Sequence, residues 1–321
     1  MTALIWEPGN GMDAAALARL RARFCKPRQP MGEAWFMGAE RRMFHELFGD
    51  LSLVDVSILQ RALGEIASGS GAFGPKPEWE DWFHYLLAQL LPRAHEQDVL
   101  ESLVSAFVAI YPTDDAAFPY ATFRDDVLAT LGRCLMAPGC WHGQEIVVGS
   151  VLHRSNCNPA QVWCWWNASG DFSASLFFCL KYLPAARIDA WLASVLSIPS
   201  PHWRAQVIVW LVGARAMLAG EMRWPSELAI GARPSIDWEW SDCLGAQLAG
   251  WHAIKGKETA DFLSRAARDR TLAVCQQFFT VDVLDAWMAS IDQVPDLAVE
   301  LAEIPKLFEE HYVQRRSTQA R

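Results

Sequence analysis

The spacing of apolar residues along the chain predicts a series of amphipathic helices. Residues 188–199 read IDAWLASVLSIP, and their apolar positions recur three and four residues apart, which is the spacing of one face of an α-helix. The same periodicity predicts further helices over residues 13–25, with Asp13 as its cap, and over 33–48, 79–91, 96–111 and 122–136. A proline closes the last three of these, because proline cannot continue the hydrogen-bond ladder. The pattern therefore predicts an all-α fold.

The phrase at 188–199 recurs later in the chain. Residues 284–295 read LDAWMASIDQVP, and six of the twelve positions are identical. Each copy ends at a proline and is followed by a second periodic helix, which predicts a helical hairpin. Two unrelated helices that begin near Asp and end before Pro would share part of this pattern. In the second copy Asp292 replaces Leu196, so we expect that position to meet water or a partner.

The segment HWRAQVIVWLVGA at 202–214 resembles the second helix of a HEAT repeat. With the repeated phrase it makes residues 180–312 similar to HEAT-like and armadillo-like helical repeat proteins. The resemblance implies an irregular HEAT-like stack of helical hairpins with an N-terminal helical cap. It also implies a binding scaffold and brings no catalytic residues with it.

The clearest break in the pattern is ASGSGAFGPKP at 67–77, which holds three glycines and two prolines and predicts a linker. The expected organisation has an N-terminal helical segment, this linker, an α-helical repeat domain and a polar tail. Their boundaries are 1–66, 67–77, 78–314 and 315–321.

Charge favours a basic protein as the partner. The net charge is -9, and residues 76–126 carry 10 acidic and 3 basic side chains. A phosphate backbone would be repelled by such a segment, whereas a cationic protein would be attracted. A nucleic-acid-binding helical repeat stays open as an alternative, with a basic face at 19–28 and 127–235.

The candidate partner-binding residues combine this acidic segment with exposed aromatic rings. WCWW at 163–166 cannot turn all its rings to one helix face, so an exposed ring there would anchor an interface. Each carboxylate alone is also compatible with a capped or solvated surface. The candidates are Glu78, Glu80, Asp81, Asp114, Asp115, Asp125, Asp126, Trp163 and Trp166.

A cluster of cysteines and histidines gives the alternative interpretation of an enzyme or a zinc-binding protein. It comprises Cys134, Cys140, His142, His153, Cys157 and Cys164. Zinc knuckles place their cysteines two to four residues apart, whereas these pairs are six and seven apart. Buried free thiols fit the spacing better, so the sequence predicts no metal or cofactor.

The sequence thus predicts a non-enzymatic protein-binding scaffold. One version is a bacterial cytoplasmic immunity or antitoxin-type protein that occludes a basic enzyme. The expectation of a cytoplasmic protein rests on the N-terminus, which lacks a signal-peptide pattern, and on apolar runs too short to span a bilayer.

Overall fold

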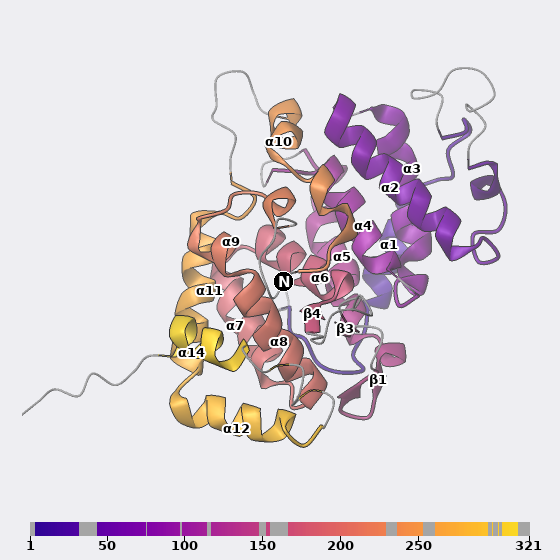
Figure 1. Cartoon of the computed structure of the whole chain (residues 1–321). Coiled ribbons are helices and arrows are strands. Elements are labelled where there is room, and N and C mark those ends of the chain that lie inside the picture. The colour runs from indigo at the N-terminus through magenta and orange to yellow at the C-terminus, as the bar shows by residue number, and fades with distance from the viewer. Residues whose placement is uncertain are drawn as a thin grey trace, which may run out of the picture.

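The computed structural model is mainly α-helical, as the sequence predicts (Figure 1). It describes residues 4–31, 44–74, 76–96, 98–113, 117–147, 152–154, 166–228, 236–252, 261–294, 297, 301 and 304–313. The α-helices are α1 (Ala14–Arg23), α2 (Val56–Phe73), α3 (Pro77–Leu90), α4 (Val99–Ile110), α5 (Phe123–Thr130), α6 (Gly170–Tyr182), α7 (Ala185–Ser197), α8 (Pro201–Gly213), α9 (Arg215–Ala219), α10 (Ala246–His252), α11 (Arg265–Phe278), α12 (Val281–Ile291) and α14 (Ile304–Tyr312).

Short 3-10 helices and two small antiparallel sheets complete the described structure. The 3-10 helices are η2 (His45–Phe48), η3 (Leu91–Arg93), η4 (Leu131–Met136), η5 (Pro138–Cys140), η6 (Pro225–Glu227) and η7 (Glu239–Cys243). β1 (Trp141–His142) pairs with β2 (Glu145–Ile146), and β3 (Leu152–Arg154) pairs with β4 (Trp166–Ala168). The periodicity of the sequence does not predict these two-stranded sheets, because strands of two or three residues leave no alternating pattern.

Side-chain caps explain where several helices begin. The carboxylate of Asp13 accepts a hydrogen bond from the Ala16 amide at 2.7 Å, as the sequence predicts for the first helix. Ser169, Ser200 and Ser264 cap α6, α8 and α11 in the same way, and each satisfies an amide that the helix itself leaves unpaired.

Helices α4 and α6 form the centre of the core. Every residue of both helices is buried, and α4 packs between α2 and α6 (Figure 1). α4 carries apolar residues around its whole circumference, which is the pattern of a helix enclosed on all sides. Two carboxyl groups, Glu101 of α4 and Asp171 of α6, are enclosed with it.

The N-terminal residues belong to the same core. Trp6 lies 5.4 Å from Trp191 and 5.8 Å from Trp203 between ring centroids, and its indole Nε1 donates to the Gly132 carbonyl at 2.7 Å. The described residues on both sides of the predicted boundary at 67–77 therefore share one hydrophobic core.

Both copies of the repeated phrase are helical. Trp191 in α7 and Trp287 in α12 are buried, and Asp292 is exposed at the end of α12. The described helices do not form a ladder of consecutive hairpins, however, because α7 packs against α11, and α8 packs against α12 and α14. The HEAT-like stack therefore remains a prediction.

Candidate functional site

The segment predicted as a linker is mostly helical. α2 continues to Phe73, so only residues 74–76 separate it from α3. The glycines serve close packing rather than flexibility. A Cβ at Gly64 would lie 2.3 Å from the Trp240 ring, and one at Gly71 would lie 3.0 Å from the Cys243 carbonyl oxygen. The two glycines lie two turns apart on one face of α2, and their lack of a side chain allows η7 to pack closely against that face.

Trp251 of α10 packs onto the end of α2. Its indole Nε1 donates to the Gly71 carbonyl at 3.0 Å. A Cβ at Gly74 would lie 3.1 Å from the ring, and the φ of 79° at Gly74 favours glycine as well. The side chain nevertheless stays 47% exposed, and among the tryptophans whose burial the structure describes, Trp251 alone is exposed. The ring is therefore held in place and still open to a partner.

Two more aromatic rings lie at other positions along α2. Phe73, the last residue of α2, is 54% exposed, and Trp240 of η7 is half-buried against Gly64. Figure 1 shows α10 next to the end of the bundle that contains α2 and α3. We call Phe73, Trp240 and Trp251, with the carboxylates of Glu65 and Asp242, the aromatic corner.

The electrostatic environment of the corner is negative. Burial raises the pKa of the Cys243 thiol to about 12. The negative charges of Asp242 and Glu65 raise it further, so both carboxylates lie close to Cys243. Burial also raises the pKa of Glu65. Residues 61–81 and 236–251 together carry seven carboxyl groups and two cations. The carbonyl end of α2 adds to this potential, because its last turn has no basic residue.

Three of the predicted binding residues lie on α3, which follows the end of α2 in the chain. Glu78 and Glu80 lie in the first turn of α3, which begins four residues after Phe73, and Asp81 follows them and is exposed. Burial raises the pKa of the Glu80 carboxyl, and the charge of Asp81 raises it further. These carboxylates add to the negative charge of the segment that follows α2.

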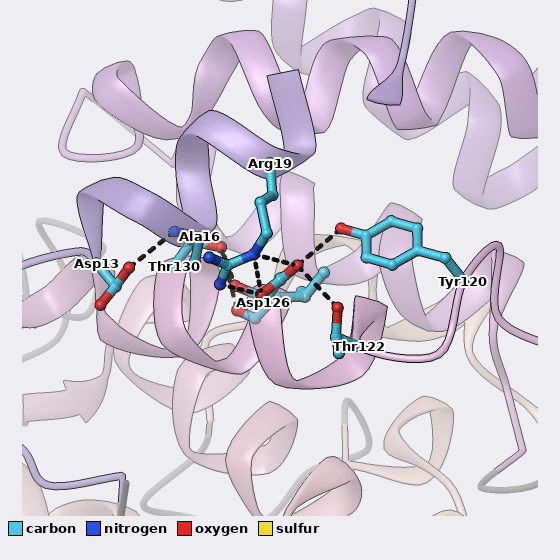
Figure 2. A network of polar contacts seen from close by, with 8 residues as sticks. Asp13, Ala16, Arg19, Tyr120, Thr122, Asp126 and Thr130 are labelled. Carbon is cyan, nitrogen blue, oxygen red and sulfur yellow. Dashed lines mark hydrogen bonds and ion pairs between the residues drawn. The ribbon is translucent and has the colours of Figure 1, made fainter. Parts of the chain in front are cut away.

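Asp126, another predicted binding residue, is enclosed in an internal network (Figure 2). Its side chain is 3% exposed and accepts hydrogen bonds from Arg19, Tyr120 and Thr122, with 2.6 Å between Arg19 Nη2 and Asp126 Oδ1. Burial raises the pKa of Tyr120, and its hydrogen bond to Asp126 adds to the shift. Asp125 pairs with Arg187 at 3.4 Å. We therefore leave both aspartates out of the surface proposed below.

The side chains of the remaining predicted binding residues are not covered by the described part of the chain. Asp114, Asp115 and Trp163 lie outside the described residues, and so does the side chain of Trp166 in β4.

The basic residues near α1 are also engaged within the protein. Arg19 pairs with Asp126, Arg21 donates to the Ala88 carbonyl, and Lys26 donates to the Phe48 and Gly49 carbonyls. Arg23 lies over the Tyr120 ring at 5.8 Å. These contacts reduce what the segment can offer to a phosphate backbone.

The structure describes only part of the cysteine and histidine cluster. Cys134 and Cys140 are buried free thiols, and burial raises the pKa of Cys140 to about 11, so the thiol is neutral at pH 7. His142 is exposed, whereas Cys157, Cys164 and the side chain of His153 lie outside the description. Within the described ranges, no group of three or more His, Cys, Asp or Glu side chains is arranged to hold a metal ion.

Comparison with known proteins adds no family. The chain gives no significant match to a protein-family model, to a curated protein or to a solved structure. The fold thus defines the class only as mainly α-helical. No helix within the described part of the chain is long and apolar enough to cross a membrane.

The close approach of Trp240 to α2 can be tested by adding one methyl group. Gly64→Ala places a Cβ 2.3 Å from the ring, so we expect Trp240 to leave α2 and the free energy of unfolding to fall by about 1–3 kcal/mol. Denaturant unfolding measures the change. Gly250→Ala in α10 is the matched control, because no atom lies within 4 Å of its added Cβ. Equal stability of the two variants would contradict the packing described for η7.

Proposed function

We propose that the protein is a non-enzymatic binding protein that holds a basic protein partner at the aromatic corner. The observation that carries this proposal is Trp251, whose ring is fixed by the Gly71 hydrogen bond and by Gly74 while nearly half of it is exposed. Tryptophans with fixed rings dominate binding energy at protein interfaces, because they bury a large area and lose little side-chain entropy.

Charge supports a basic partner. The corner contains Glu65 and Asp242, α3 after it carries Glu78 and Asp81, and the whole chain has a net charge of -9. Such a field speeds the approach of a cationic protein and disfavours acidic competitors. An immunity or antitoxin-type protein that covers the active site of a basic enzyme is one version of this function.

The test is affinity purification of the tagged full chain from its own cells, followed by mass spectrometry. We expect a basic protein to copurify with the wild-type chain and to be lost, by about tenfold or more, from Trp251→Ala. Loss of a central tryptophan anchor costs at least about 2 kcal/mol, and about 1.4 kcal/mol is enough for a tenfold loss.

Leu53→Ala supplies the matched control, because Leu53 is an exposed apolar side chain on the loop before α2 and lies outside the corner. It should retain the partner. The proposal fails if no protein is enriched with the wild-type chain, or if Trp251→Ala and Leu53→Ala retain the same protein equally.

A further inference from the structure

We infer that the aromatic corner recognises an arginine side chain of the partner, with the guanidinium group stacked on the open face of Trp251. This inference rests on the proposed function and names the chemical group that the corner binds. Three features of the corner support it: the ring, the carboxylates and the end of α2.

The ring of Trp251 is partly open to solvent. Its Nε1 is used in the hydrogen bond to Gly71, and Gly74 lies against one side of the ring. The π-face of an indole carries negative potential, and tryptophan attracts cations more strongly than the other aromatic residues do. An exposed and immobile indole face is therefore a prepared surface for a cation.

Two carboxylates belong to α2 and to η7, and both η7 and α10 pack against α2. Trp251 and the Cys243 carbonyl both approach Gly71, and Asp242 directly precedes Cys243. Glu65 lies on α2 close enough to raise the pKa of the Cys243 thiol. A cation on the ring would thus approach an acidic stretch of the surface that contains Asp242 and Glu65, with Phe73 at the end of α2.

The carbonyl end of α2 adds negative potential at the same place. α2 has eighteen residues and ends at Phe73 without a basic side chain in its last turn. A cation at such a helix end is stabilised by the helix dipole. Residues 61–81 contain two cations, and neither lies in the last turn of α2. Arg61 lies over the Phe44 ring at 5.3 Å, and Lys76 is half-buried where α3 begins.

Arginine fits this combination better than lysine. The guanidinium group is planar, so it can stack on an indole and still donate two hydrogen bonds in its plane to a carboxylate. It also loses less hydration than an ammonium group when it is covered. The corner offers a flat ring and neighbouring carboxylates, which is the arrangement that a planar cation can use fully.

The test uses three short synthetic peptides of equal length that carry two arginines, two lysines or two glutamates among glycine and serine. Binding to the full chain is followed through the indole ¹H–¹⁵N resonance of Trp251, which the Trp251→Phe variant assigns. We expect the arginine peptide to shift this resonance at millimolar concentration and to bind about three- to fivefold more tightly than the lysine peptide. The glutamate peptide should leave it unshifted.

Substitution of the carboxylates completes the test. Asp242→Asn with Glu65→Gln should weaken the arginine peptide by about tenfold, whereas Asp285→Asn, an exposed carboxylate on α12, should have no effect. The inference is overturned if the arginine peptide leaves Trp251 unshifted, or if lysine binds equally well. If a basic protein still copurifies in a Trp251-dependent manner, the proposed function stands and only the arginine assignment falls.

Discussion

Raising the pH from 6.5 to 8 is expected to lower the free energy of unfolding by about 3 kcal/mol, because two buried carboxyl groups are kept protonated in the folded protein. Glu101 and Asp171 are only 3% and 8% exposed, and the Glu101 amide donates to Asp171 Oδ1 at 2.9 Å. Gly170 permits the Glu101 carboxyl group to lie against α6, since a Cβ at this position would lie 1.3 Å from Glu101 Oε2.

The environment of this pair explains the direction of the shifts. Burial raises the pKa of Glu101 to about 9, and the charge of Asp171 adds to the shift. Burial likewise raises the pKa of Asp171 to about 8. The facing charges are also negative, with Asp98 beside the start of α4 and Glu239 on η7, whose backbone amide donates to Glu101 and partly offsets the shift.

The sign of the pH effect follows from proton binding. Above pH 6.5 both carboxyl groups are ionised in the unfolded chain and protonated in the folded one, so each pH unit costs about 1.4 kcal/mol per group. Their contribution is fully present below the unfolded pKa values, falls as the pH rises, and is completely lost once the pH has passed the folded values of about 8 and 9. His84, whose pKa burial lowers to about 4, is neutral in both states over most of this window.

Chemical unfolding at several pH values measures this slope. Glu101→Gln and Asp171→Asn should each flatten it by the share of one group, and the side-chain amide that Asp171→Asn introduces can still accept the hydrogen bond from the Glu101 amide. Asp285→Asn, which is exposed on α12, should leave the slope unchanged. A wild-type stability that stays constant or rises between pH 6.5 and 8 would show that the pair is ionised in the folded protein.

Trp6→Ala is expected to cost about 3–5 kcal/mol, because it empties the space between Trp191 and Trp203 and removes the indole that donates to the Gly132 carbonyl. Trp6 is 2% exposed although it lies before the first helix. Thermal or denaturant unfolding measures the loss.

The neighbouring residue gives the control for this prediction. Ile5 is a large apolar side chain that is largely exposed, so Ile5→Ala should change the stability by no more than about 0.5 kcal/mol. Similar losses for the two variants would mean that Trp6 does not hold the N-terminal residues to the core.

The sequence predicts where the helices of this protein lie in the chain better than it predicts which helices pack together. The periodicity at 188–199 and 284–295 correctly places Trp191 and Trp287 on buried helix faces, and Asp13 caps the first helix as its position predicts. These features depend on residues within a few turns of each other, so local spacing reveals them.

The linker prediction at 67–77 is wrong for residues 67–73 for a physical reason. Gly64, Gly71 and Gly74 make room for Trp240, Cys243 and Trp251, which lie more than 170 residues later in the chain. Glycine lowers helix propensity, but tertiary packing overrides a local preference. Nothing in the local sequence distinguishes a flexible glycine from one that a distant ring requires.

Some carboxylates of the acidic segment are enclosed in the protein and others are exposed, and the sequence does not reveal which. Asp126 is enclosed by Arg19, which lies 107 residues earlier, whereas Asp81 stays exposed near the corner. Composition gives the net charge of a segment, and only the fold shows which carboxylates have found a partner inside the protein.

The most direct test of the account is site-specific cross-linking in cells. A photoreactive residue is placed at Gln247, exposed on α10 four residues before Trp251, and separately at Gln277, exposed on α11. We expect a basic protein to be cross-linked from position 247 and not from 277, and Trp251→Ala to abolish the product. Cross-linking from 277 alone, or a product at 247 that persists in Trp251→Ala, would contradict a binding site at the aromatic corner.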